Sequence, residues 1–273
     1  MKKLLQDKNN NLILLSIITI SKNDLRGLKK TFESIKYQNI VFDRIEWVVK
    51  DGNSKDGSID FLRGVEIKST IRVKIITQED KSIYDAMNIG LNNSKGQFVQ
   101  FMNAGDTYFN SESLQSVFNE IKKNEDVLMV YGGHQDIFEN GEIINKHPRQ
   151  LDYLNYGLPT SHQAIFYNQT YINDIKYNLK YNTSADYQFT AEIFIQNRSI
   201  SASIINKPII KFFIGGNSTK KQKELLYDCF LIRREILSKS IMNSSIDYVR
   251  RWLSLLLFHN FKRIYRAFRF IIN

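Results

Sequence analysis

Three aspartates stand just beyond predicted strands in the first half of the chain: Asp51, Asp80 and Asp106. Ligands of open α/β sheets bind outside the carboxyl ends of the strands, so we expect these three side chains to share one edge. A cluster of carboxylates repels phosphate, but Mg²⁺ or Mn²⁺ takes oxygen ligands and can bridge the two. Each aspartate alone also fits a plain turn or a helix cap, and that alternative stays open.

The chain is organised around the stretch from Gly96 to Thr107. It begins as a short apolar strand and stops on the small polar turn Asn103-Ala104-Gly105-Asp106. A buried strand that delivers Asn103 and Asp106 to its carboxyl end is a common way to build a site in such a sheet. The other strands must then deliver complementary side chains to the same edge.

The elements that position these residues alternate between strand and helix up to Asp106. Nearly continuous apolar runs predict parallel strands buried on both faces, and apolar repeats at helical spacing predict the helices between them. The predicted strands cover residues 12–20, 45–50, 73–77 and 98–102. This repetition predicts an α/β fold with a parallel, doubly wound sheet.

Beyond Asp106 the alternation changes. Asn140-Gly141 lies between two extended segments and predicts a hairpin. The other predicted elements are a helix over 111–123, strands over 127–131 and 164–167, a helix from 186 to about 196, two strands around Lys207-Pro208 and a basic helical tail from Thr219.

Composition limits the class of protein. A chain of 273 residues with 42% hydrophobic residues has ample material for a core and is not a disordered protein. The single cysteine, Cys229, excludes a disulfide framework and a cysteine-based zinc site, and it fits a reducing compartment. No signal-peptide apolar region follows Met1, and the run over 12–20 is too short to span a bilayer. The net charge of +10 permits phosphorylated ligands, anionic lipid or nucleic acid.

Four segments in this order resemble family 2 glycosyltransferases, which are inverting enzymes of the GT-A fold. They are Ile17-Ile18-Thr19 with Asn23, Trp47 to Ser58, Glu79 to Gly90, and Phe101 to Asp106. The second and third resemble the branch that builds bacterial capsule, exopolysaccharide and lipopolysaccharide sugars. The resemblance covers about residues 12–218 and implies a Rossmann-like, mostly parallel central sheet flanked by helices.

The resemblance implies a binding site for a nucleotide-sugar donor. Asp51 corresponds to the acid that hydrogen-bonds the uracil of a UDP-sugar, and the backbone near Thr19 and Ser21 lines the same pocket. Asp80 and the stretch from Lys81 to Asn88 correspond to the segment along the ribose, the diphosphate and the donor sugar. The predicted donor-binding residues are Thr19, Ser21, Asn23, Asp51, Asp80, Lys81, Tyr84, Asp85, Asn88, Asn103, Ala104 and Gly105.

The turn Asn103-Ala104-Gly105-Asp106 occupies the place of the family's Asp-x-Asp metal motif. Asn103 and Gly105 stand where acids are usual, so Asp106 is the one predicted metal ligand. One carboxylate and the diphosphate oxygens can still hold Mg²⁺ or Mn²⁺, because such an ion keeps several waters. We therefore expect a divalent cation as cofactor, bound weakly in the absence of nucleotide.

Asp186 lies in a motif, Ser184-Ala185-Asp186-Tyr187-Gln188, that resembles the one carrying the family's general base. An inverting transfer needs one carboxylate to take the proton as the acceptor hydroxyl attacks C1. The alternative is that Asp186 only caps a helix beginning at Tyr187. His162-Gln163 resembles a pair common in this branch, for which a contact with metal, diphosphate or acceptor and a structural hydrogen bond are both open.

The predicted organisation is a catalytic domain over 1–218 and a helical extension over 219–273. The nucleotide-binding half covers about 12–110 and the acceptor half about 111–218. Over 249–273, apolar side chains repeat on one helical face and lysines and arginines gather largely on the other. This pattern predicts a helix lying on an anionic membrane, and a helix packed on the core or on a second subunit is the alternative. The sequence does not specify the oligomeric state.

The function that accounts for most of these features is transfer of a sugar from a nucleotide-sugar, UDP-linked, to a glycan or lipid-linked acceptor of a bacterial surface polysaccharide. Such an enzyme would lie in the cytoplasm, on the inner face of the cell membrane. A nucleotidyltransferase that makes a nucleotide-sugar is one alternative, although Ser21-Lys22-Asn23-Asp24 lacks a glycine-rich phosphate loop. A non-catalytic basic module is another, but the densest positive charge lies in the last helix, so we expect no nucleic-acid partner.

Overall fold

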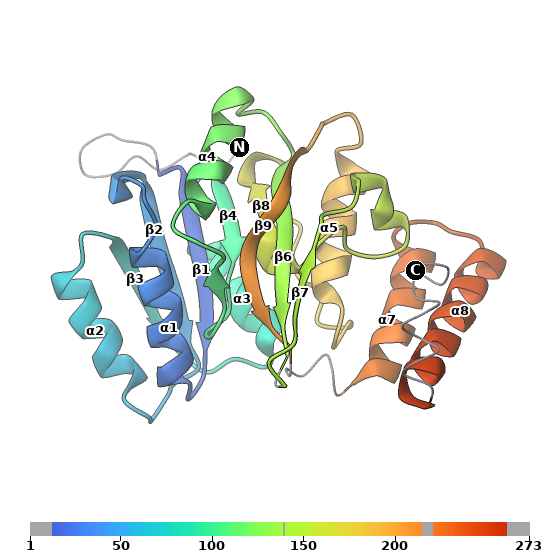
Figure 1. The fold of residues 1–273 in the computed structure, drawn as a ribbon, viewed down its shortest axis with the longest axis horizontal. Coiled ribbons are helices and arrows are strands. Elements are labelled where there is room, and N and C mark those ends of the chain that lie inside the picture. The colour runs from blue at the N-terminus through green and yellow to red at the C-terminus, as the bar shows by residue number, and fades with distance from the viewer. Residues whose placement is uncertain (1–12, 139, 215–220, 261–273) are drawn as a thin grey trace.

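The computed structural model describes residues 13–138, 140–214 and 221–260, with side chains up to residue 254. In this part of the chain nine strands form one sheet, in the order β3-β2-β1-β4-β8-β6-β9-β5, with β7 paired to β6 (Figure 1). The strands are β1 Leu15–Ser21, β2 Ile45–Asp51, β3 Arg72–Thr77, β4 Phe98–Phe101, β5 Thr107–Tyr108, β6 Met129–Ile137, β7 Ile143–Lys146, β8 Ile165–Asn168 and β9 Ser203–Phe213.

Helices cover both faces of this sheet. The helices are α1 Leu25–Lys36, α2 Ser58–Lys68, α3 Ile83–Asn92, α4 Ser113–Lys123, α5 Ala185–Gln196, α7 Gln222–Glu235 and α8 Ile241–Asn260. Four short 3-10 segments are η1 Phe42–Arg44, η2 Leu151–Asn155, η3 His162–Ala164 and η4 Gln169–Tyr171.

The first four strands are all parallel to one another, as the sequence predicts. Every residue of β1, β2 and β4 is buried, as expected for parallel strands that are covered on both faces. β3 is the edge strand and its residues are half-buried or exposed. The α/β class and the helix-flanked central sheet are therefore confirmed.

The second half of the sheet pairs differently. β8 is antiparallel to both β4 and β6, β5 is antiparallel to β9, and only β6 with β9 is parallel. The predicted hairpin at Asn140-Gly141 is confirmed by the antiparallel pairing of β6 with β7. Parallel pairing is thus concentrated on the β1–β4 side of the sheet.

The two strands predicted around Lys207-Pro208 are one strand, β9, and that prediction was wrong. Ile205 pairs with Gly132 and Pro208 with Gly133, so residues 206 and 207 form a bulge opposite consecutive glycines. Proline has no backbone N–H for the ladder, and a bulge is where a strand can accommodate it.

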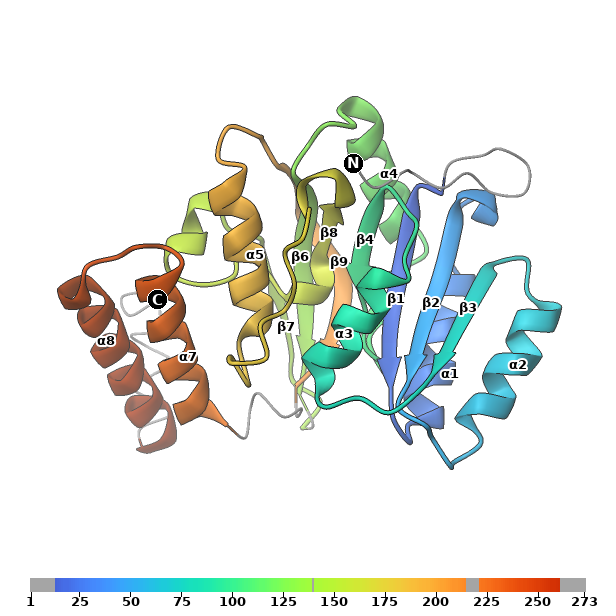
Figure 2. The same ribbon diagram turned by 180° about the vertical axis from the view of Figure 1, so that it is seen from behind.

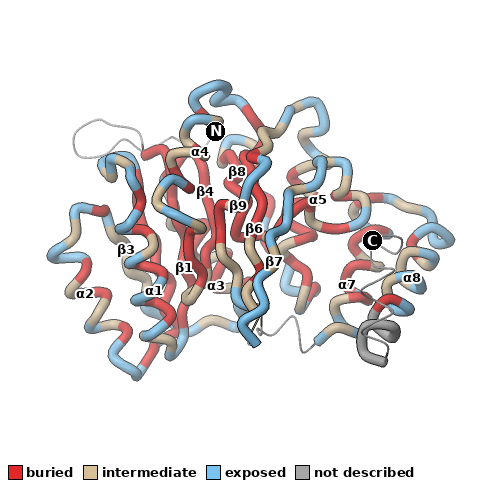
Figure 3. Tube along the Cα trace, viewed as in Figure 1, coloured by how far each residue is buried: buried red, intermediate tan, exposed pale blue. Residues whose placement is uncertain are grey.

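Two cores lie on opposite faces of the sheet. Side chains of α1, α2 and α4 pack on one face, and side chains of α3, α5 and α7 on the other. Figures 1 and 2 show these two layers from opposite sides, and Figure 3 shows the buried strands between them.

The beginning of the predicted extension packs on the second core. Leu226, Cys229 and Ile232 of α7 are buried there. Arg233 of α7 and Arg251 of α8 both donate hydrogen bonds to the carbonyl of Tyr156, at 2.8 and 2.7 Å. Most of the membrane-facing pattern predicted over 249–273 lies outside the residues whose side chains are described. Among the described helices, none is long and apolar enough to cross a membrane.

Candidate functional site

The predicted gathering of carboxylates at one edge of the sheet follows from the strand register. Ser21 at the end of β1 pairs with Asp51 at the end of β2, and Asp51 pairs with Thr77 at the end of β3. Asp80 follows β3 and Asp106 follows β4, which is parallel to β1. The parallel strands therefore carry all three aspartates to their common carboxyl edge.

A lysine that the sequence analysis did not single out joins two of these strand ends. Lys50 is fully buried at the end of β2 and forms an ion pair with Asp80. Its ammonium also donates to the carbonyls of Gln78 at 2.8 Å and Asp51 at 3.2 Å. A lysine inside an apolar strand is the signal that could have identified it, because buried lysines are nearly always paired.

Asp51 is fully buried and is held by its own loop. Its two carboxylate oxygens accept hydrogen bonds from the amide and the hydroxyl of Ser54, each at 2.7 Å. Asp51 therefore does form the turn proposed as the alternative to ligand binding. Its strand neighbour Ser21 is different, because the buried Ser21 hydroxyl has no hydrogen-bond partner in the described part of the chain. Such an orphaned group next to a carboxylate suits a polar ligand.

Two other predicted donor residues have structural partners. The Thr19 hydroxyl accepts a hydrogen bond from the indole of Trp47 at 2.9 Å inside the sheet. Asn23 has a left-handed backbone, φ 53°, and its side chain accepts from the amide of Lys55 at 2.8 Å. Asn23 thus fixes the loop after β1 to the loop after β2. Thr19 and Asn23 would therefore contact a ligand through their backbone atoms.

The start of α3 is a capping arrangement. The Ser82 hydroxyl accepts from the amide of Asp85 at 3.2 Å, and the Asp85 carboxylate accepts from the amide of Lys81 at 2.9 Å. Asn88 makes two 2.9 Å hydrogen bonds with the backbone of Tyr177. The side chains of Asp85 and Asn88 are therefore occupied by the protein itself, whereas Lys81 is exposed.

The turn after β4 is fixed by a residue of α1. The Thr31 hydroxyl accepts from the amide of Gly105 at 3.0 Å and donates to the carbonyl of Asp106 at 2.9 Å. Gly105 has φ 98°, a conformation that favours glycine. The amide of Ala104 continues the pairing with β1 by donating to Ile20 at 3.2 Å. The sequence analysis did not identify Thr31, because it lies 74 positions before Gly105 in the sequence.

Asp106 is buried below this turn. One of its carboxylate oxygens accepts from the amide of Asn103 at 3.1 Å. Burial raises the pKa of Asp106 to about 7, against the opposing effects of the Asn103 amide, a hydrogen bond from Gln163 and the nearby Lys30.

The residues present fit a divalent cation only in part. No group of three or more His, Cys, Asp or Glu side chains that could hold a metal occurs among the described residues. Mg²⁺ prefers about six oxygen ligands, and this turn supplies the carboxylate of Asp106. The remaining ligands would have to be water and a bound diphosphate, so the donor set suits a cation shared with a ligand.

Asp186 lies on the opposite side of the site, in the first turn of α5. The residue at the N-cap is Ser184, so the N-cap role considered for Asp186 is wrong. The Asp186 carboxylate accepts from the amide of Tyr187 at 2.9 Å and from the hydroxyl of Tyr84 at 3.5 Å. Burial is the largest cause and raises the pKa of Asp186 to about 6, although the hydrogen bonds from Tyr187 and Tyr84 act in the opposite direction. A carboxylate with this pKa can take and hold a proton near neutral pH.

The loop that carries Asp186 is clamped by α7. Asp228 accepts hydrogen bonds from the amide and the hydroxyl of Thr183, at 2.8 and 2.7 Å. The Ser184 hydroxyl lies 3.8 Å from the sulfur of Cys229. The sequence analysis assigned both α7 residues to the extension and gave them no role in the site.

His162 is buried in an aromatic cluster. Its Nε2 is 2.8 Å from the hydroxyl of Tyr177, and its ring stacks on Phe101 with centroids 5.3 Å apart. Burial lowers the pKa of His162 to about 3, so the ring is neutral at physiological pH. This is the structural hydrogen bond considered among the alternatives. Gln163 differs, because its side chain reaches Asp106 while its carbonyl accepts from Gln100 at 2.7 Å.

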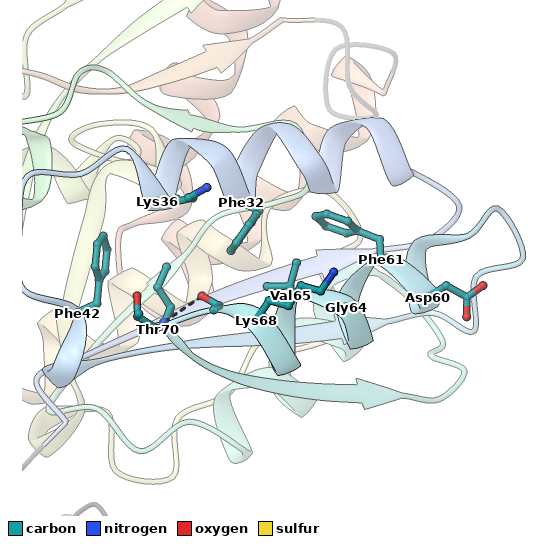
Figure 4. A pocket seen from close by; sticks show the side chains of 11 residues that line it. Phe32, Lys36, Phe42, Asp60, Phe61, Gly64, Val65, Lys68 and Thr70 are labelled. Carbon is teal, nitrogen blue, oxygen red and sulfur yellow. Dashed lines mark hydrogen bonds between the residues drawn. The ribbon is translucent and has the colours of Figure 1, made fainter.

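One cavity of about 590 Å³ is lined by residues from both the nucleotide-binding half and the acceptor half of the chain. It is lined by Tyr84, Asn103, Gln163 and Asp186 together with polar residues of β6, β7 and the segment before η3. A second cavity of about 520 Å³ lies between α1 and α2 (Figure 4). Its walls are the rings of Phe32, Phe42 and Phe61 with Val65, and it contains none of the predicted site residues. The first cavity is therefore the one of these two that gathers predicted site residues.

The match to known proteins is consistent across sequence and structure. The family described as "Glycosyl transferase family 2" matches residues 16–240. A "PGL/p-HBAD biosynthesis glycosyltransferase" of Mycobacterium bovis is 28% identical over 245 residues, which cover 88% of this chain and 91% of that protein.

Solved structures show the same fold at low sequence identity. S. aureus TarS 1-349 in complex with UDP-GlcNAc aligns with a TM-score of 0.66 and 17% identity, over 90% of this chain and 73% of TarS 1-349. The mannosyltransferase PcManGT from Pyrobaculum calidifontis, in complex with GDP-Man and Mn²⁺, aligns with a TM-score of 0.65 and 12% identity, over 86% of this chain and 69% of PcManGT.

Proposed function

Because the chain belongs to glycosyl transferase family 2 and is a glycosyltransferase, we propose that it transfers a sugar from a UDP-sugar to an acceptor hydroxyl with inversion at C1. The observation that carries this proposal is the shared cavity. Asn103, beside the predicted diphosphate position, and Asp186, the predicted base, line the same space.

The donor is expected at the carboxyl edge of β1, β2 and β4. Asp51 is already oriented by Ser54, and each of its oxygens has a second lone pair with which to accept an N–H of the base. The Ser21 hydroxyl, which has no partner among the described residues, is available beside it. UDP is preferred to GDP because the matching motif around Asp51 resembles uracil-binding members of the family. TarS has been solved with UDP and UDP-GlcNAc, whereas PcManGT was solved with GDP-Man.

Asp106 would hold Mg²⁺ or Mn²⁺ together with the donor diphosphate. A bound cation would neutralise charge on the departing diphosphate. Thr31 keeps the Asp106 turn in place, because its hydroxyl accepts from the amide of Gly105 and donates to the carbonyl of Asp106. The protein therefore contributes a prearranged carboxylate instead of a complete metal cage.

Asp186 would act as the general base. Its carboxylate takes the proton of the acceptor hydroxyl while the hydroxyl oxygen forms a bond to C1. The bond between C1 and the diphosphate oxygen breaks, and its electron pair leaves with the diphosphate. Tyr84 stays protonated throughout, because burial raises its pKa far above neutral, and it can only donate its proton toward Asp186.

The acceptor is proposed to be a glycan or lipid-linked molecule of a bacterial surface polysaccharide, with the enzyme on the inner face of the membrane. The described part of α8 supports a membrane contact. Met242, Ile246, Val249 and Leu253 recur at helical spacing, and about half or more of each is exposed. Arg250 is exposed on the same helix, and a basic side chain next to an apolar face favours anionic lipid.

A thermal-shift screen of UDP, GDP and UDP-sugars, each with Mg²⁺ or Mn²⁺, tests the donor assignment. A ligand at 100 times its Kd stabilises the native state by about 2.7 kcal/mol, so true donors raise the Tm. Asp51→Ala should abolish the shift by UDP, and Asp60→Ala on α2 is the matched control. Stabilisation by GDP and not by UDP would overturn the uracil assignment.

Flotation with vesicles tests the membrane contact separately. Wild-type protein should float with vesicles containing phosphatidylglycerol, and a variant with serine at Met242, Ile246, Val249 and Leu253 should not. Val41→Ser with Ile67→Ser removes exposed apolar side chains elsewhere and should leave flotation unchanged. Equal flotation of all three proteins would exclude α8 as the contact.

A further inference from the structure

We infer that the cavity holding Asp186 contains a subsite for an oxyanion of the acceptor, and that Arg149 is the residue that binds it. The inference rests on the proposed transfer reaction and adds the chemical class of the acceptor. Arg149 and Asp186 line the same cavity, whose lining also includes Asn103 of the turn after β4 and the segment before η3.

The charges on the cavity wall opposite Asp186 are mostly paired within the protein. Lys146 of β7 lies 2.6 Å from the buried carboxylate of Asp136, which His134 also approaches at 3.4 Å. Lys221 lies 3.3 Å from Glu224, one turn further along. These two lysines therefore leave little net charge for a ligand.

Arg149 has no such acidic partner in the part of the chain that the structure describes. Its guanidinium lies over the ring of Tyr153, 4.0 Å from the ring centroid. Stacking occupies the face of the guanidinium and leaves its N–H groups free at the edge. Arg149 is thus an uncompensated cation with its donors available.

The backbone of Arg149 is fixed on both sides, so the side chain starts from a defined position. Its amide donates to the carbonyl of Pro159 at 2.8 Å, and its carbonyl accepts from the hydroxyl of Tyr131 at 2.9 Å. Tyr131 is a core residue of β6. A fixed, stacked arginine loses little freedom when it binds, which favours bidentate recognition of a planar carboxylate or a phosphate.

A neutral acceptor would gain only ordinary hydrogen bonds to its hydroxyls from Arg149. An acceptor with a phosphate or a carboxylate would gain a charge-assisted, bidentate pair, which is stronger. The phosphate of a lipid carrier and the carboxylate of an acidic sugar are two sources of this one chemistry.

The test measures binding of small probes to the full chain with the donor site filled by UDP and Mg²⁺. Glucose 1-phosphate, glucuronic acid and glucose are titrated by ligand-observed NMR. We expect the two anions to bind at least tenfold more tightly than glucose. A stronger response to glucose 1-phosphate identifies phosphate as the source, and a stronger response to glucuronic acid identifies carboxylate.

Arg149→Gln should remove the preference for the anions, and Arg149→Lys should keep part of it, because lysine retains the charge without the planar fork. Arg198→Gln, at an exposed arginine after α5, is the matched control and should behave as wild type. If Arg149→Gln does not fold, the comparison of Arg149→Lys with wild type still decides the matter.

Equal binding of glucose and both anions, binding of none of them, or an unchanged preference in both Arg149 variants would overturn the inference. These outcomes are separable from failure of the proposed donor site. If UDP does not stabilise the protein, the donor assignment fails, and the anion titration is read without nucleotide.

Discussion

The proposed site has a donor wall, formed by the strand ends that carry Asp51 and Asp106, and an acceptor wall, formed by the loop and helix start that carry Asp186, and the two are built in different ways. On the donor wall, site residues are held by neighbours a few positions away, as Asp51 is by Ser54 and Asp106 by Asn103. On the acceptor wall, Asp186 approaches Tyr84, which is 102 residues away in sequence, and its loop is clamped by Asp228, 45 residues beyond Thr183. The carboxylates of the donor wall are thus held within their own loops, with Thr31 and Lys50 as supports from other elements, whereas the acceptor wall is assembled from distant segments.

This difference decides what each substitution should disturb. Changes on the donor wall should act on ligand affinity or on one loop, because the carboxylates of Asp51 and Asp106 each accept a hydrogen bond from within their own loop. Changes on the acceptor wall should act on the reactivity of Asp186, because its surroundings come from several elements.

The largest expected effect is that of Asp186→Asn. Removal of a general base lowers rates by roughly 10²–10⁴-fold. The UDP-induced thermal shift should be nearly unchanged, because Asp186 does not lie on the donor wall. Initial rates of sugar transfer and thermal shifts on the same preparation provide the measurement, and transfer at wild-type rate would remove Asp186 from the mechanism.

The pH dependence of transfer should follow the ionisation of Asp186. With saturating Mg²⁺ to keep Asp106 ionised, the pKa of about 6 for Asp186 predicts a rate that is half-maximal near pH 6 and falls about tenfold per unit below it. Stability should move the other way. The folded state holds this proton more tightly than the unfolded chain, so the contribution of Asp186 to stability is lost as pH rises from about 4 to about 6.

Unfolding free energies of wild type and Asp186→Asn between pH 4 and 6.5 isolate that contribution. The difference between the two proteins should change in favour of the variant as pH rises. A constant difference across this range would contradict the raised pKa.

A smaller effect is expected for Asp228→Asn, which removes the charge that clamps the Asp186 loop. We expect kcat to fall about tenfold while UDP affinity is retained. The charge of Asp228 also raises the pKa of Asp186, so the variant should shift the midpoint of the pH–rate profile downward. Thr183→Val, which keeps the amide hydrogen bond and the charge, is the control and should leave the midpoint in place.

The smallest effect is expected on the donor wall itself. Gly105→Ala places a side chain at φ 98°, where the space is open but the backbone conformation is unfavourable, at a cost of about 1–2 kcal/mol. Gly64→Ala, inside α2 and with nothing within 4 Å of the added carbon, should instead stabilise by about 0.5–1 kcal/mol. Urea unfolding of both variants gives the comparison, and a stabilising Gly105→Ala would show that the turn does not need its glycine.

The same contrast explains what could be predicted from the sequence. The strands β1 to β4 and the edge at Asp51 and Asp106 could be predicted, because each is indicated by a local pattern of apolar residues followed by turn residues. The contacts made by Lys50, Thr31 and Tyr177 could not be predicted, because their partners are distant in sequence and lie on other elements. The Lys207-Pro208 segment was predicted as two strands instead of one, because its bulge lies opposite Gly132 and Gly133 of β6, a pairing that the local sequence does not indicate. The roles of the donor residues and of Asp186 remain predictions.

The clamp from Asp228 to Thr183 also sets an order of events during synthesis. Domains form from the N-terminus as the chain emerges from the ribosome. The strands that present Asp51 and Asp106 are synthesised before α7, so the clamp on the Asp186 loop can form only after residue 228 has emerged. A chain that ends before residue 228 would therefore lack this clamp.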